Sequence, residues 1–384
     1  MRVTESGVSL EVPGTSTEGV EEAVFYNPRQ TLKRDLTIAA LRAARTERGV
    51  EGEYLDAMTA SGIRGIRAAK DGWRTTVCDR DPEAVALARR NLENNGLAVR
   101  DGRGTDDAVG VVQDNTNAVL HGERTDVVDL DPYGTPMPFA DAAFAGTREL
   151  VCVTATDTAP LCGAHLNSGI RSYGTVPRNT EYHPEMGVRT LLSGLARSAA
   201  RFDVGVTPLC THATSHYVRT YLGLERRATA ADRALEALGY VHHCPECLYR
   251  ETALGLIADP PASCSHCRSD QLLTAGPLWL ERVHDPAFLA AMADSVDPAF
   301  DTAAQATELL DTLAVELEVP THYDQHRICK RLGVSAGGMR DLLERLRDAG
   351  CGASRTHYGG TTFKTDAPLE VIETATLEGA NDST

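Results

Sequence analysis

The chain has 384 residues, 42% of them apolar and 24% charged, which excludes a disordered or fibrous chain and favours two or three domains. It holds no run of 18 apolar residues and no basic start followed by an apolar segment, so we expect a cytoplasmic protein without a membrane span or a secretion signal. The net charge is -16 and lysine is rare, which predicts a halophilic source and leaves nucleic acid open as a partner, because salt screens the acidic surface.

The first part of the chain predicts alternating strands and helices. We expect short strands and turns over residues 1–27 and a helix over 30–47, from its apolar spacing. Further strands are expected at 53–58, 74–79, 110–114, 125–131 and 149–157, with helices at 63–70 and 82–95. Such alternation is typical of a parallel sheet with right-handed crossovers. The sequence therefore predicts an α/β, Rossmann-like domain.

The second part of the chain predicts a helix at 187–201, a strand at 216–227 and a domain boundary within 277–286. Helices are then expected over 287–317 and 338–349, with a helix-turn-helix pattern at 325–349, followed by a pair of strands at 352–358 and 361–368. We expect a first domain of residues 1–275, with an N-terminal extension (1–50) and a zinc-ribbon-like insertion (240–270). A smaller α+β domain would comprise residues 276–384.

Three acids lie at the ends of successive predicted strands. Asp56 precedes a loop that contains Gly62 and Gly65, and Asp79 follows Asp56 by 23 residues. An acid about 20 residues beyond such a loop can accept hydrogen bonds from ribose hydroxyls. Asp114 could bind the exocyclic amine of adenine. The loop is not GxGxxG, so S-adenosylmethionine fits better than a dinucleotide; the alternative is that these acids are ordinary turn residues.

The segment Asp131-Pro132-Tyr133-Gly134 follows the fourth predicted strand. Amide and purine amino groups are poor nucleophiles, and an acceptor such as Asp131 or the Pro132 carbonyl can polarise one and take its proton. Tyr133 can stack on a base. The spacing resembles the Asp/Asn-Pro-Pro-Tyr/Phe motif of methyltransferases that act on exocyclic amines. The alternative is a proline-glycine turn after a buried strand.

Four cysteines form two tight pairs with the pattern Cys-x2-Cys-x16-Cys-x2-Cys, namely Cys244, Cys247, Cys264 and Cys267. Four thiolates suit a tetrahedral Zn²⁺ and leave no open coordination position, so the metal would be structural. The alternative is four free thiols.

Several segments together resemble one family. They are FYNPRQTLKRDL (25–36), LDAMTASGIRGIR (55–67), DLDPYGTP (129–136), VTATDTAPLCGAH (153–165), PLWLE (277–281) and ASRTHYGGTTFKT (353–365). These segments resemble the archaeal and eukaryotic tRNA guanine-26 N2-dimethyltransferases. The resemblance implies an enzyme that transfers methyl groups from S-adenosylmethionine to the N2 of a tRNA guanine, once and then again.

The resemblance also implies roles for individual residues. Arg34 would contact the cofactor carboxylate and Arg64 would lie in the cofactor loop. Asp79 would bind the ribose, and Asp114 with Asn115 the adenine. Asp131 would be the catalytic acceptor, next to Tyr133, which stands where many members of the family have phenylalanine.

Basic residues near these motifs, and the helix-turn-helix pattern, suggest contacts with tRNA phosphates. The residues are Arg29, Lys33, Arg34, Arg64, Arg67, Arg171, Arg178, Arg355 and Lys364. Two other functions stay open at this point: an amino methyltransferase acting on DNA adenine or a protein amide, and an inactive relative that binds zinc and tRNA. No protein partner is evident from the sequence.

Overall fold

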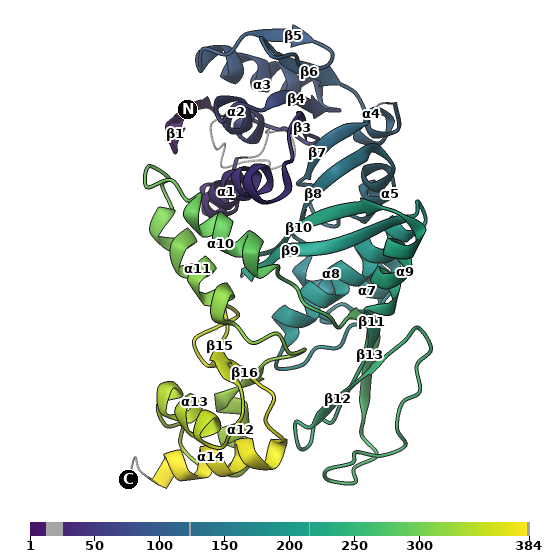
Figure 1. Cartoon of the computed structure of the whole chain (residues 1–384), viewed down its shortest axis with the longest axis vertical. Helices are drawn as coiled ribbons and strands as arrows, with labels where there is room; N and C mark the ends of the chain where they lie inside the picture. Colours follow the sequence, from purple (N-terminus) through teal and green to yellow (C-terminus); the bar gives the residue numbers. More distant parts are fainter. Residues whose placement is uncertain (13–25, 123, 215, 382–384) are drawn as a thin grey trace.

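The computed structural model describes residues 1–12, 26–122, 124–214 and 216–381 (Figure 1). Within them, an eight-stranded sheet has the order β5-β6-β4-β3-β7-β8-β10-β9. The strands are β3 (Glu53–Asp56), β4 (Arg74–Asp79), β5 (Val99–Asp101), β6 (Val109–Gln113), β7 (Thr125–Leu130), β8 (Thr147–Ala155), β9 (Val204–Thr214) and β10 (Tyr217–Arg226). The predicted α/β fold is confirmed.

One strand of this sheet departs from the expected parallel arrangement. From β5 to β8 in the order of the sheet, each strand is parallel to the next one, whereas β10 is antiparallel to both β8 and β9. The five strands predicted in the first part of the chain, which are β3, β4, β6, β7 and β8, are therefore parallel as expected, and the antiparallel strand is β10, for which no direction was predicted. Only two residues separate β9 from β10 in the chain, and so short a connection joins antiparallel strands, because a parallel pair needs a crossover of about a dozen residues.

Helices cover both faces of the sheet. On one face, α5 (Met137–Gly146) and α8 (His183–Ala200) share a hydrophobic cluster with Leu55, Val128 and Val151. On the other, α1 (Thr31–Arg48) packs with Tyr54 and Val127, as expected from the alternation of side chains along a strand.

The remaining elements of this region are β1 (Arg2–Glu5), β2 (Val8–Glu11), α2 (Ile63–Lys70), α3 (Pro82–Asn94), α4 (Thr116–Gly122), α6 (Thr158–Leu161), α7 (Leu166–Tyr173) and α9 (Ala228–Glu236). Strands β1 and β2 form the expected strands near the N-terminus; the rest of that predicted segment, residues 13–25, lies outside the described residues.

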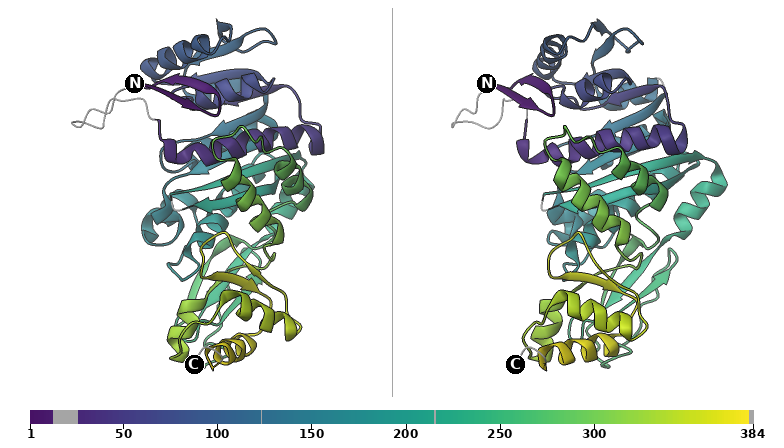
Figure 2. Two further views of the ribbon diagram at one scale, coloured as in Figure 1. Left: turned by 90° about the vertical axis from the view of Figure 1, so that its left-hand side faces the viewer. Right: turned by 60° about the vertical axis from the view of Figure 1, so that its left-hand side comes forward.

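The expected helical stretch 287–317 consists of two helices, α10 (Pro286–Asp294) and α11 (Ala303–Val315). They lie beside α1 (Figure 2) and share its hydrophobic cluster through Phe288, Met292 and Leu310. The domain boundary at residue 276 stays a prediction, and these two helices beyond it pack on the sheet domain.

A second, antiparallel sheet carries the cysteine pairs. It consists of β11 (Leu238–His243), β12 (Arg250–Leu254) and β13 (Leu273–Trp279), in the order β12-β11-β13. Next to it in Figure 1 lies the last part of the chain, with β14 (Tyr323–Asp324), α12 (Gln325–Leu332), α13 (Met339–Asp348), β15 (Ala353–Arg355), β16 (Thr362–Thr365) and α14 (Leu369–Asn381).

The expected helix-turn-helix and strand pair are therefore present, as α12 with α13 and as β15 paired with β16. Cys244, Cys247 and Cys264 pack with Leu342 and Phe363 in one cluster, so the cysteine-bearing sheet contacts the C-terminal helices. None of the helices in the described part of the chain is long and apolar enough to cross a membrane.

Candidate functional site

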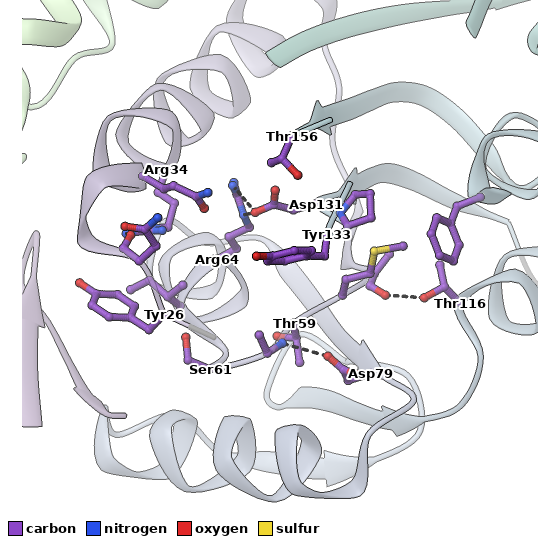
Figure 3. A pocket seen from close by; sticks show the side chains of 18 of the residues that line it. Tyr26, Arg34, Thr59, Ser61, Arg64, Asp79, Thr116, Asp131, Tyr133 and Thr156 are labelled. Carbon is purple, nitrogen blue, oxygen red and sulfur yellow. Dashed lines mark hydrogen bonds and ion pairs between the residues drawn. The ribbon is translucent and has the colours of Figure 1, made fainter. Parts of the chain in front are cut away.

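A cavity of about 600 Å³ lies at the carboxyl ends of β3, β4 and β7 (Figure 3). Tyr26 and Arg34 lie on one side of it, and Asp79 lies across from them. Asp131 and Tyr133 lie between the two sides. The cavity thus brings together residues from Tyr26 to His216, as expected where strands far apart in the chain end at one edge of a sheet.

Two cations hold the carboxylate of Asp131. Lys33 Nζ lies 2.6 Å from Oδ1, and the Arg64 guanidinium donates to Oδ2 over 2.8 and 3.1 Å. Burial acts to raise the pKa of Asp131, but the Arg64 and Lys33 charges outweigh it and hold that pKa far below its usual range. Asp131 is therefore an anion with a fixed orientation at the cavity wall.

A second carboxylate, Asp129, lies beneath the first and is fully buried. Both its oxygens accept hydrogen bonds from the Arg219 guanidinium at 2.8 Å, and one also accepts from Tyr54 Oη at 3.1 Å. Arg64 bridges the two acids, since its Nη1 lies 3.3 Å from Asp129. The sequence analysis missed Arg219; the available signal was a charged residue within the otherwise apolar strand HYVRTYLGL.

The glycine loop after β3 is held from below by Asp56. Its Oδ2 accepts hydrogen bonds from Thr59 Oγ1 at 2.8 Å and from Gly65 N at 3.1 Å. A Cβ at Gly65 would lie 2.2 Å from Val77 Cγ1, so glycine permits the close packing of α2 on β4. Burial and the neighbouring Asp129 raise the pKa of Asp56 to about 7.

The predicted cofactor acids differ in their positions. Asp79 lines the cavity, and its carboxylate accepts hydrogen bonds from Ala60 N at 3.0 Å and Asp81 N at 3.1 Å. Asn115 also lines it. Asp56 and Asp114 are not among the lining residues: Asp56 is buried under the loop, and Asp114 is exposed beyond the end of β6.

Arg34 lines the cavity but is already paired. Its guanidinium donates to both oxygens of Glu5, at 2.7 and 2.5 Å, and lies 5.2 Å from the ring centre of Tyr26. Only 5% of its side chain is exposed. Tyr26 was not predicted as a site residue, because an aromatic residue in an irregular segment carries no pattern of its own.

Tyr133 stands at the mouth of the cavity with 88% of its surface exposed. Pro132 and Gly134 flank it, and Gly134 N donates to Thr156 Oγ1 at 2.7 Å while Thr156 N donates back to the Gly134 carbonyl at 3.0 Å. This pair of bonds fixes the turn that presents Tyr133. An exposed aromatic ring at a cavity mouth is available to stack on a planar ligand.

The four predicted metal ligands come together as expected. The sulfurs of Cys244, Cys247, Cys264 and Cys267 all lie within 4.8 Å of one another. The pairs Cys244–Cys267 and Cys247–Cys264 are each 3.6 Å apart. Tetrahedral Zn–S bonds of about 2.3 Å place sulfurs about 3.8 Å apart, so the arrangement fits a closed Zn²⁺ site.

Nine basic residues were expected to contact RNA, and for five of them the structure shows that this expectation is wrong. Lys33, Arg34, Arg64, Arg67 and Lys364 are buried and paired with carboxylates. Their charged groups lie inside the protein and pair with carboxylates there, so they cannot reach a phosphate backbone. Exposed positions remain for Arg29, Arg171 and Arg355, and Arg178 is partly exposed.

A doubly wound sheet with a polar cavity at the carboxyl ends of its strands defines a Rossmann-like, cofactor-dependent enzyme. The family model described as "N2,N2-dimethylguanosine tRNA methyltransferase" matches residues 7–376. The chain therefore belongs to this family of tRNA methyltransferases.

Individual relatives agree with this assignment. The chain is 54% identical to the tRNA (guanine(26)-N(2))-dimethyltransferase of Haloarcula marismortui, over 98% of this chain and 100% of that protein. It is 42% identical to the protein of that name from Methanosarcina mazei, over 96% and 95% of the two chains. The solved structure of Trm1 from Pyrococcus horikoshii with S-adenosyl-L-methionine covers 98% of this chain and 99% of its own, with a TM-score of 0.88 and 30% identity.

Proposed function

We propose that this protein transfers methyl groups from S-adenosylmethionine to the N2 of guanine 26 in tRNA, once and then a second time. The observation that carries the proposal is the single cavity that joins the glycine loop and Asp79 to Asp131 and Tyr133. One part of that cavity suits a nucleoside cofactor and the other suits an amino group on a planar base. A halophilic source and a cytoplasmic location accord with the haloarchaeal relatives and a tRNA substrate.

The residues of the cavity fit S-adenosylmethionine. A volume of about 600 Å³ lies in the range of about 300–1,000 Å³ that small-molecule sites occupy. Asp79 would accept hydrogen bonds from the ribose hydroxyls, and Asn115 would face the adenine. The glycine loop after β3, near Arg34 and Arg64, would face the amino acid end of the cofactor. When bound, the cofactor supplies a methyl group on a cationic sulfur.

Asp131 is the acceptor for the hydrogens of guanine N2 in this proposal. Lys33 and Arg64 fix the orientation of the Asp131 carboxylate. The carboxylate can therefore hold the guanine amino group in one orientation while the N2 lone pair becomes localised on nitrogen. The Pro132 carbonyl follows directly in the same turn, and Tyr133 offers its ring face to the base. Guanine in a tRNA must leave its stack to reach such a cavity.

Zn²⁺ on the four cysteines would have a structural part only, since four thiolates complete its coordination. The cluster packs against the C-terminal helices, so the metal would fix the position of that part of the chain. Together with α12 and α13, it forms a candidate surface for the body of the tRNA.

Nucleoside analysis by mass spectrometry would test the proposal. A tRNA transcript incubated with the protein and S-adenosylmethionine should yield N2-methylguanosine and then N2,N2-dimethylguanosine, and a transcript with adenine at position 26 should yield neither. The variant Asp131→Ala should bind cofactor normally while the single-turnover rate falls by about two to four powers of ten. Methylation of a DNA oligonucleotide or a protein amide instead would support the other amino methyltransferases, and no methyl transfer at all would support an inactive relative.

A further inference from the structure

Lys33 is a buried amine that touches the proposed catalytic acid. Its side chain projects from α1 with 1% of its surface exposed, and its Nζ lies 2.6 Å from Asp131 Oδ1. The contact joins residues that are 98 positions apart. A role in RNA contact is excluded by this burial, and the proposed function has so far given Lys33 no task beyond holding the carboxylate.

The charges that face Lys33 act on its proton in opposite directions. The Asp131 carboxylate attracts a proton to Lys33, while the guanidiniums of Arg64 and Arg219 repel one, and the ring of Tyr217 lies 5.4 Å from Nζ. Burial is the largest influence and lowers the pKa of Lys33 to about 7, from the usual 10.5. The amine is therefore able to gain and lose a proton near neutral pH, which an ordinary surface lysine does not do.

The reaction requires a proton acceptor that Asp131 alone does not provide. Each methyl group added to N2 replaces one hydrogen, which leaves as a proton. The pKa of Asp131 is held far below its usual range by Arg64 and Lys33, so this carboxylate binds hydrogens well but retains a transferred proton poorly. A neutral amine in contact with it would complete the transfer.

We infer that Lys33 is a positioning residue for Asp131 that also receives, through Asp131, the proton that guanine N2 loses during methyl transfer. The N2 lone pair forms the bond to the methyl carbon, while the carbon–sulfur bond breaks and its electron pair stays on sulfur. The N2 proton passes to an Asp131 oxygen, and its bonding electrons stay on nitrogen. Asp131 then gives that proton to the lone pair of the Lys33 amine, which becomes an ammonium and returns the proton to water before the next transfer. The inference rests on the proposed function.

The test is the single-turnover rate as a function of pH, at saturating cofactor and tRNA and at constant high KCl. In the native protein the rate should rise about tenfold per pH unit below pH 7 and level off above it. Lys33→Arg keeps the positive charge but does not titrate, so we expect a rate at least about a hundredfold lower and no inflection. Lys33→Met, which removes both the charge and the amine, should also lose the inflection while it binds S-adenosylmethionine with unchanged affinity.

Control variants distinguish titration of Lys33 from other causes of an inflection in the pH profile. Lys70→Arg changes an exposed lysine in α2 and should leave the pH profile unchanged. Asp56, whose pKa is raised to about 7, lies under the glycine loop, and His216 lines the cavity, so Asp56→Asn and His216→Gln should both keep the inflection. An inflection that disappears with Asp56→Asn and persists in Lys33→Met would overturn the inference.

The remaining outcomes are also decisive. A native rate that is flat between pH 6 and 9, or a Lys33→Arg variant with native rate and profile, would show that Lys33 only neutralises Asp131. If a Lys33 variant does not fold, a native inflection that persists in both Asp56→Asn and His216→Gln supports Lys33, and an inflection lost in either variant contradicts the inference. A native protein that methylates no tRNA at any pH would contradict the proposed function itself, which is a different result from an active enzyme with a flat profile.

Discussion

The ammonium group of Lys364 lies 3.2 Å from a carboxylate oxygen of Glu185, and both side chains are buried. Lys364 belongs to β16 near the end of the chain, and Glu185 belongs to α8 beneath the large sheet. The same ammonium lies 3.0 Å from Glu316, which also accepts a hydrogen bond from His357 Nδ1 at 2.7 Å. A buried ion network therefore connects the C-terminal part to the sheet domain.

We expect Lys364→Met to lower the free energy of unfolding by about 3–5 kcal/mol, because removal of one member of a buried ion pair leaves the other charge unpaired. Urea unfolding at constant high KCl would measure this. Lys330→Met, at an exposed lysine in α12, is the matched control and should change the free energy by no more than about 0.5 kcal/mol. Equal effects of the two substitutions would contradict the role assigned to the network.

Asp79→Ala should weaken S-adenosylmethionine binding by about tenfold to a hundredfold, since a charged hydrogen bond contributes on the order of 1.5–3 kcal/mol. Asp114→Ala removes a neighbouring acid that does not line the cavity, so its affinity should stay within about threefold of the native value. Calorimetric titration of the two variants with the cofactor would decide. A larger loss for Asp114 than for Asp79 would reverse the assignment of the cofactor acids.

Cys247→Ser should lower both the bound zinc and the melting temperature, because the metal's binding energy contributes to folding. Cys351→Ser is the control: this cysteine packs against the same hydrophobic cluster but is not one of the four grouped sulfurs, so its loss should leave one zinc per chain. Elemental analysis beside thermal unfolding gives both readouts. Native stability in a metal-free preparation would refute a structural zinc.

The rate of tRNA methylation should rise with KCl to an optimum above about 1 M, where the screening length is about 3 Å. In dilute buffer a net charge of -16 repels tRNA, whereas in strong salt the repulsion is screened and close contacts remain. A KCl titration of the initial rate, followed in parallel by circular dichroism, is the measurement. An optimum near 0.1 M in a fully folded protein would contradict this expectation.

Local sequence signals predicted the elements that build the cofactor side of the cavity. Helix α3 was expected because Pro82 suits a first turn and Gly96 follows the end, and the structure adds an Asp81 cap that accepts from Glu83 N. Strand β9 was not predicted; Pro208 lies within it, and proline argues against a strand interior. The structure accommodates Pro208 where the register with β10 shifts, next to Leu222.

The ion pairs around the cavity could not be predicted in the same way. Lysine and arginine are seldom buried, so Lys33, Arg34 and Arg64 were expected near tRNA phosphates, and Arg34 and Arg64 also at the cofactor. Their partners, Glu5 and Asp131, are brought to them only by the tertiary fold, and no local spacing rule relates them. The motif Asp131-Pro132-Tyr133 was found because its members are consecutive, whereas the residues that orient it are dispersed.

Helix α1, which carries Lys33, is braced from outside by residues far along the chain. Thr302 N donates to Asp35 Oδ2 at 3.0 Å, and Arg42 donates to the Ser295 carbonyl at 3.2 Å. A fragment ending at residue 276 would lose α10 and α11 and expose the apolar side of α1 to water. Separately made fragments 1–276 and 277–384 should therefore complement each other: neither alone would methylate tRNA, and mixing them would restore the catalytic centre by re-forming this helix contact together with the pairing of β13, which the cut divides.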